Sequence, residues 1–170
     1  NSASAELFRS LRSNVGFMIP ADVTNPVILV TSSINSEGKS YVATNLAISL
    51  SLLQKKVALV GLDIRKPMLA KYLNLPSKGC VTSYLSDASY TVDDLIVASE
   101  FKGLDILPAG AIPPNPSELL QGQRLDELFA ELRKRYDYVI IDSAPVAMVS
   151  DTFLLNRVAD LTVYVSRARY

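Results

Sequence analysis

Residues 33–40 have the composition and spacing of a phosphate-binding loop. The pattern requires Gly, four residues and then Gly-Lys-Ser/Thr, and the segment departs from it only at the first position, where Ser33 stands. In such a loop backbone N–H groups surround phosphate oxygens, the lysine reaches the β- and γ-phosphates, and the last hydroxyl binds Mg²⁺. The segment therefore predicts binding of ATP or ADP with Mg²⁺. The residues expected to contact the nucleotide are Asn35, Ser36, Glu37, Gly38, Lys39, Ser40 and Tyr41.

Two carboxylates follow apolar runs that have the pattern of strands. Asp142 ends the run that begins at Tyr138, and Asp63 follows the run 57–62. Because a right-handed crossover brings these strands into the same sheet as the loop, both acids are expected close to the phosphates. The metal ligands predicted in this way are Ser40, Asp63 and Asp142.

Phosphoryl transfer leaves side chains two main tasks, which are to hold the metal and to handle the proton of the attacking hydroxyl. Asp63 suits either task. Arg65 could neutralise charge on the transferred phosphoryl group, or it could be an exposed structural arginine. The predicted catalytic residues are Lys39, Asp63 and Arg65.

Alternating strand and helix patterns surround these residues. The run 26–31 before the loop predicts a buried strand, and the pattern 41–54 after it predicts a helix. We therefore predict an α/β fold with an open, mostly parallel, P-loop NTPase-like sheet and helices on both faces. The other expected strands are 57–62, 104–107, 138–141 and 161–165, and the other expected helices are 4–18, 67–73, 93–99, 116–135 and 150–158.

The overall composition limits the classes of function that the chain could have. The 170 residues suit one domain, and 17 basic residues balance 17 acidic ones, so charge gives no support for nucleic-acid binding. The absence of histidine removes Ser-His-Asp catalysis and histidine-ligated metals. No apolar run approaches the length of a membrane span. Asn1 is not a natural start, so the chain is expected to be a fragment of a longer protein.

With these motifs the chain resembles the cytoplasmic kinase domain of the bacterial tyrosine kinases that control capsule and exopolysaccharide synthesis. The matching segments are the loop 33–40, the motif 61–65 after the second strand, the acid-ended strand 138–142, the stretch 113–120 and an N-terminal helix motif made by Glu6, Arg9 and Arg12.

The resemblance implies a tyrosine autokinase that transfers phosphate from MgATP to a C-terminal tail. It also implies a ring-like homo-oligomer, with tails phosphorylated in trans, at the cytoplasmic face of the inner membrane beside a membrane-bound adaptor, fused or separate. Residues 1–170 would form one kinase domain, with an oligomerisation helix in 1–20 and a nucleotide-binding core in 21–170. Without the resemblance, Arg9 and Arg12 suggest only a solvated helix face, with Glu6 pairing to Arg9.

The chain departs from the family at specific places. Ser33 replaces a glycine that the family often replaces, and Gly61 stands where the first Asp of an Asp-x-Asp-x-Arg motif belongs, so that Asp63 would serve alone. The C-terminal tyrosine cluster is absent from these residues. Tyr138 and Tyr164 lie in apolar runs and are expected to pack in the core.

Alternative functions stay open at this point. A deviant P-loop ATPase of the partition or division type would carry a lysine where Ile34 stands. A nucleotide-sensing regulatory module is favoured by Gly61. A purely structural ring-forming domain would leave Lys39, Ser40 and Asp142 without a purpose.

Overall fold

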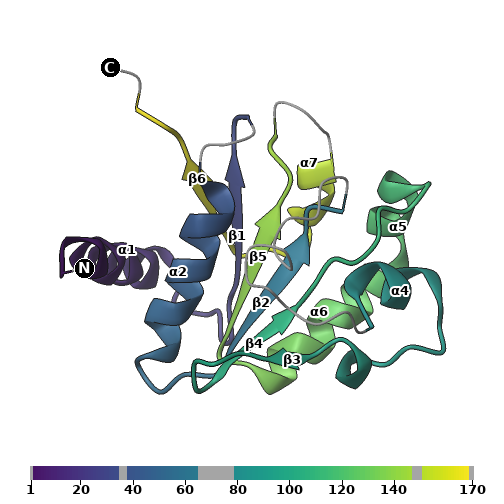
Figure 1. Ribbon diagram of the computed structural model, residues 1–170, viewed down its shortest axis with the longest axis horizontal. Coiled ribbons are helices and arrows are strands. Elements are labelled where there is room, and N and C mark those ends of the chain that lie inside the picture. Colours follow the sequence, from purple (N-terminus) through teal and green to yellow (C-terminus); the bar gives the residue numbers. More distant parts are fainter. Residues whose placement is uncertain (1, 35–37, 65–78, 147–150, 169–170) are drawn as a thin grey trace.

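A single sheet forms the centre of the molecule in the computed structural model, which describes residues 2–34, 38–64, 79–146 and 151–168 (Figure 1). Within these residues the strand order is β3-β4-β2-β5-β1-β6. All neighbouring pairs are parallel except β3 and β4, as the sequence predicts for most of the sheet. The strands are β1 (Val27–Ser32), β2 (Val57–Leu62), β3 (Val97–Ala98), β4 (Leu104–Leu107), β5 (Tyr138–Ser143) and β6 (Leu161–Val165).

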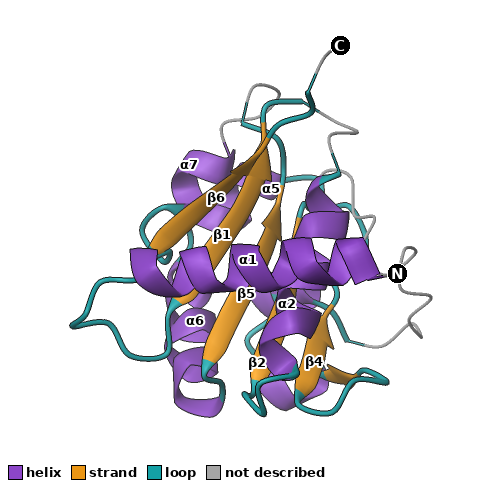
Figure 2. Ribbon diagram, turned by 90° about the vertical axis from the view of Figure 1, so that its left-hand side faces the viewer, coloured by secondary structure: helices purple, strands orange, loops and turns teal. Residues whose placement is uncertain are grey.

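Helices cover both faces of the sheet, which confirms the predicted fold class (Figures 1 and 2). On one face α1 crosses α2, and the core beneath them includes Val15, Leu46 and Ile140. On the other face the remaining helices enclose a second core, which includes Phe129. The helices are α1 (Ser2–Met18), α2 (Lys39–Ser51), α4 (Val81–Ser86), the 3-10 turn η1 (Val92–Asp94), α5 (Pro116–Gln121), α6 (Gln123–Arg135) and α7 (Asp151–Leu155).

The central strands β1, β2 and β5 are apolar because both of their faces are covered. Every residue of β1 and β2 is buried, and β5 is buried from Val139 onward. Strand β5 lies between β1 and β2, so the chain segments that follow all three strands meet at one edge of the sheet. This topology brings the predicted site residues together.

Two of the helices expected from the sequence are wrong, and one helix was not expected. The helix expected over 116–135 is two helices that meet at Gly122, whose extended backbone (φ −69°, ψ 157°) interrupts the helical turn. The helix expected over 93–99 is instead the turn η1 followed by the edge strand β3. Helix α4 was not foreseen, because its six residues are too few to show a helical period. The helix expected over 67–73 lies outside the described residues.

The N-terminal helix packs less fully than its apolar pattern predicts. Val15 is buried, whereas Leu7 and Met18 are 70% and 67% exposed. Phe8 makes an edge-to-face contact with Tyr41 at the start of α2. Among the described helices, none combines the length and the apolar character needed to cross a bilayer.

Candidate nucleotide site

Helix α2 begins directly at the end of the phosphate-loop pattern. Its N-cap, Gly38, has a φ of 86°, in the left-handed region that favours glycine. A Cβ atom at this position would meet nothing within 4 Å, so backbone conformation rather than space selects the glycine. Asn35, Ser36 and Glu37 lie outside the described residues.

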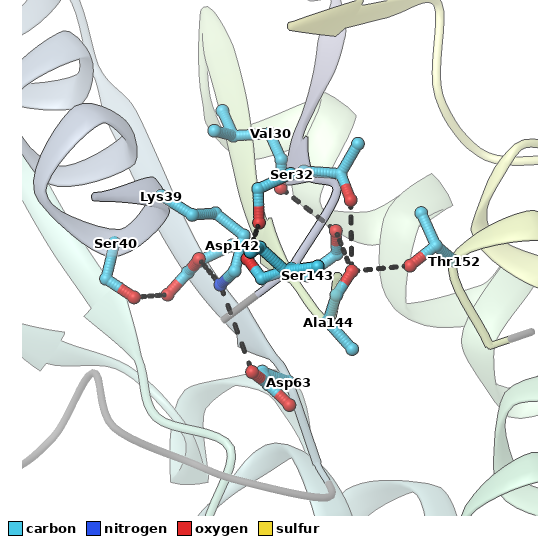
Figure 3. A network of polar contacts seen from close by, with 11 residues as sticks. Val30, Ser32, Lys39, Ser40, Asp63, Asp142, Ser143, Ala144 and Thr152 are labelled. Atoms are coloured by element: carbon cyan, nitrogen blue, oxygen red, sulfur yellow. Dashed lines mark hydrogen bonds and ion pairs between the residues drawn. The ribbon is translucent and has the colours of Figure 1, made fainter. Parts of the chain in front are cut away.

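Lys39 lies between two carboxylates at the carboxyl edge of the sheet (Figure 3). Its Nζ atom is 2.5 Å from Oδ1 of Asp142 and 3.9 Å from Oδ2 of Asp63. The hydroxyl of Ser40 donates to the other oxygen of Asp142, at 2.8 Å. The structure therefore brings together the described residues that the sequence assigned to phosphates and metal.

The charged groups of this site are largely buried, so each needs a partner of opposite charge. The side chains of Lys39 and Asp142 are 9% and 3% exposed, and that of Asp63 is 14% exposed. A charge removed from water to this degree must be compensated by a partner of opposite sign. The ammonium group of Lys39 faces two carboxylates, so its charge is shared between β5 and the end of β2.

Hydroxyl groups hold the chain directly after Asp142 (Figure 3). Ser143 donates to the carbonyl of Val30 at 2.9 Å. Thr31 and Thr152 both donate to the carbonyl of Ala144, at 3.0 and 2.6 Å. These contacts tie the end of β5 to β1 and α7, while the Asp142 carboxylate itself is held by Lys39 and Ser40. The sequence does not predict these contacts, because a threonine within a strand or a helix belongs to no motif.

Gly61 lies directly beside Asp142 in the register of β2 and β5. A Cβ atom on Gly61 would come within 2.9 Å of the backbone nitrogen of Ala109, in the segment that follows β4. This distance is shorter than ordinary Cβ contacts, and backbone cannot move aside as easily as a flexible side chain. A side chain at position 61 would therefore require the backbone near Ala109 to shift.

Ser33, the first residue of the loop, has its hydroxyl 2.5 Å from the hydroxyl of Tyr164 on β6. Tyr164 is 53% exposed, so its expected place in the core is wrong. The reason is that β6 is an edge strand: Leu161, Val163 and Val165 pack against the core under α1 and α2, and the alternation of side chains turns Tyr164 the other way. Tyr138, in contrast, packs against that core as expected.

The oxygen atoms of this site suit a magnesium ion. Ser40, Asp63 and Asp142 offer hydroxyl and carboxylate oxygens, the hard ligands that Mg²⁺ prefers. In the described part of the chain no cluster of three or more Asp, Glu, Cys or His forms a metal cage. A site with one or two carboxylates is typical of Mg²⁺ that also binds substrate phosphates. Arg65 lies outside the described residues.

The residues of the N-terminal helix motif have separate contacts. Arg9 pairs with Glu6 at 3.0 Å on an exposed face, as their spacing predicts. Arg12 instead reaches α2, where its Nη1 atom donates to the carbonyl oxygen of Ser49 at 2.8 Å and to the Ser49 hydroxyl at 3.2 Å. Arg12 therefore helps to fasten α1 to the helix that begins at Lys39.

Comparison with known proteins identifies the family. Residues 27–165 match the model of a family described as "AAA domain". The tyrosine-protein kinase YwqD of Bacillus subtilis is 38% identical over 164 residues, which are 96% of this chain and 68% of YwqD. The chain belongs to the bacterial tyrosine-protein kinase family.

Other members of the bacterial tyrosine-protein kinase family are longer. A putative tyrosine-protein kinase in the cps region of Klebsiella pneumoniae is 32% identical over 95% of this chain, which spans only 22% of that relative. Among solved structures, the kinase domain of the Escherichia coli tyrosine kinase ETK has a TM-score of 0.90 and 27% identity. The match covers 96% of this chain and 64% of the chain in that kinase-domain structure.

The fold extends beyond the tyrosine kinases. The septum site-determining protein MinD of Pyrococcus horikoshii, solved with Mg-ADP, has a TM-score of 0.71 at 21% identity. The match covers 83% of this chain and 57% of the MinD chain. At that identity the likeness concerns the fold alone, and it confirms the predicted P-loop NTPase-like architecture.

Proposed function

We propose that this chain is the kinase domain of an ATP-dependent protein-tyrosine autokinase that regulates capsule or exopolysaccharide synthesis and export. The observation that carries the proposal is the contact of Lys39 with Asp142 and Asp63, beside Ser40, at the start of the helix that follows the phosphate-loop pattern. Membership of the tyrosine-protein kinase family supports the choice of tyrosine as the acceptor.

Nucleotide binding would begin at Lys39. A phosphate group brings negative charge to the edge of the sheet. The ammonium group of Lys39 could exchange its contact with Asp142 for contacts with phosphate oxygens, and it would still face negative charge. The positive end of α2 lies at the same point and would favour the phosphates further. We propose that the other residues of the segment 35–41 make the remaining contacts with the nucleotide.

Ser40, Asp63 and Asp142 would hold the Mg²⁺ ion that accompanies ATP. When bound, the ion neutralises charge on the β- and γ-phosphates during transfer. The carboxylate of Asp142 is held by Lys39 and Ser40, and the bonds of Thr31 and Thr152 to the carbonyl of Ala144 hold the chain two residues further on. The protein would thus present a fixed oxygen set to the ion before the nucleotide arrives.

Asp63 is the proposed acceptor of the tyrosine proton. In the reaction the phenolic oxygen forms a bond to the γ-phosphorus, the bond from that phosphorus to the β-bridging oxygen breaks, and ADP leaves. The proton of the phenol passes to the Asp63 carboxylate and then to solvent. Arg65, two residues further, would balance charge on the transferred phosphoryl group.

Assembly is the second part of the proposal. By resemblance, tyrosines in a C-terminal tail would be the acceptors, and copies of the domain would form a ring in which each tail enters the site of a neighbour. Glu6 and Arg9 lie exposed on α1 and are available for contacts between copies. The proposed partner is a membrane-bound adaptor at the cytoplasmic face of the inner membrane.

The test is an incubation of the chain with γ-labelled ATP, Mg²⁺ and a Glu/Tyr copolymer as acceptor, followed by separation of phosphotyrosine from free phosphate. We expect labelled phosphotyrosine, which Lys39→Met abolishes and which Lys55→Met, a control at an exposed lysine, retains. Asp63→Asn should reduce the rate strongly, whereas Asp22→Asn, a control at an exposed carboxylate, should not.

The other products of the same incubation decide between the alternatives. Release of free phosphate without phosphotyrosine would favour an ATPase, the reading that the MinD-like fold leaves open. Nucleotide binding without either product would favour a nucleotide-sensing module, which the absence of a carboxylate at Gly61 supports. Either result would overturn the kinase proposal.

A further inference from the structure

A hydroxyl pair lies at the point where the chain leaves β1 and enters the phosphate-loop pattern. The Ser33 and Tyr164 hydroxyls are 2.5 Å apart. One residue earlier, Ser32 donates to the carbonyl of Ile34 at 2.9 Å. The carbonyl of Ser32 in turn accepts from the backbone nitrogen of Val146 at 2.9 Å. Ser33, the first residue of the pattern, is thus tied to β6, and Ser32 before it is tied to the chain that follows β5.

Ser33 takes the place of a glycine without needing a glycine conformation. Among the described non-glycine residues only Asn25 and Gln54 have a positive φ, so Ser33 lies in the ordinary region. Serine therefore adopts this backbone conformation without strain, and it adds a hydroxyl. That hydroxyl reaches a tyrosine on the neighbouring strand, in the register where Thr31 of β1 pairs with Tyr164.

We propose that Tyr164 is a positioning residue for nucleotide binding, which acts through Ser33 to fix the start of the phosphate-binding loop. The loop must hold its backbone N–H groups in one arrangement to bind phosphate, and ordering a loop from many conformations opposes binding. A bond from a strand of the sheet to the first loop residue restricts those conformations beforehand. The proposal rests on the nucleotide binding of the proposed function, but not on tyrosine as the acceptor.

A double-mutant cycle on nucleotide affinity tests this pair. The dissociation constant of a fluorescent ADP analogue is measured with Mg²⁺ for the wild type, Ser33→Ala, Tyr164→Phe and the double variant. We expect each single variant to raise the constant by about 2- to 10-fold, the range of one hydrogen bond's net contribution. The double variant should match a single one, because both changes remove the same contact.

Two controls separate positioning from general damage. Ser33→Thr keeps a hydroxyl and should bind as the wild type does, and Thr162→Val, on the same exposed face of β6, should also leave the constant unchanged. The midpoint of thermal unfolding without nucleotide should be the same for all variants, because the pair is exposed.

Unchanged affinity in both single variants, or effects that multiply in the double variant, would overturn the proposal. A fall in the unfolding midpoint that parallels the loss of affinity would also overturn it. If the kinase assay gives no phosphotyrosine but the double variant still binds as a single variant does, the role proposed for Tyr164 stands. The two proposals can therefore fail separately.

Discussion

Gly61 lies beside Asp142 in adjacent strands, and the backbone nitrogen of Ala109 closes the space that a side chain at position 61 would occupy. The resemblance to the family motif places an aspartate at this position, whereas here the segment that follows β4 lies where its Cβ atom would be. Of the motif's two carboxylates, Asp63 alone remains, and it shares Lys39 with Asp142.

Restoring the family's aspartate should therefore harm this protein. We expect Gly61→Asp to lower the free energy of unfolding by about 1–3 kcal/mol, the usual penalty for overpacking a well-packed site. It should not raise the rate of tyrosine phosphorylation. Gly61→Ala is the matched control, because it adds the Cβ atom without the charge and should destabilise to a similar degree. A faster kinase with Asp at position 61 would contradict the close approach to Ala109.

The Ser40 hydroxyl should matter only when magnesium is present. Ser40→Ala removes a contact to the charged Asp142 and a proposed ligand of the ion. We expect ATP affinity in Mg²⁺ to fall about tenfold or more, consistent with roughly 1.5–3 kcal/mol for a contact to a charged group. In EDTA the variant and the wild type should bind ATP equally weakly. Isothermal titration in both buffers measures the difference, and an equal loss in EDTA would assign Ser40 a purely structural role.

Arg12 should stabilise the domain itself, in addition to any part in assembly. Arg12→Ala removes two hydrogen bonds to Ser49, so we expect the free energy of unfolding to fall by about 1–3 kcal/mol in urea denaturation. Arg9→Ala breaks only an exposed pair with Glu6 and should change stability by less than about 1 kcal/mol. Light scattering then separates the roles, because a lower mass of the proposed oligomer in Arg9→Ala at unchanged stability would show that Arg9 contacts another copy.

Tyr136 should make the domain sensitive to alkaline pH. Burial, together with a hydrogen bond to Asp105, raises the pKa of Tyr136 well above its ordinary value of about 10. The folded state therefore keeps a proton that the unfolded state loses. The stabilisation is complete below pH of about 10 and declines as pH rises above it toward the folded pKa.

Denaturation of wild type and Tyr136→Phe across pH 8–11, a range set by the tyrosine pKa of about 10, tests this effect. The stability of the wild type should fall more steeply at the alkaline end, because phenylalanine has no proton to lose. Parallel pH profiles would mean that Tyr136 ionises as easily in the folded chain as in the unfolded one.

Much of the fold could be predicted because the sequence pattern and the structure have the same physical origin. The central strands are buried on both faces, so continuous apolar runs such as 57–62 predict them within a residue or two. The prediction was wrong where local pattern competes with packing. Gly122 splits one expected helix, and the segment after Asp94 pairs with β4 as an edge strand, although its residues also suit a helix.

The sequence by itself determined the phosphate-loop pattern with Lys39 and Ser40, and the two acids Asp63 and Asp142 that follow apolar runs, because residue type and spacing within one loop or one strand are local properties. The tertiary structure decided which distant residues support them. Thr152, Ala109 and Tyr164 are far from the loop in the chain, and only the strand order and register bring them beside Ala144, Gly61 and Ser33. Contacts of this kind depend on the packing of the whole sheet, which no short segment encodes.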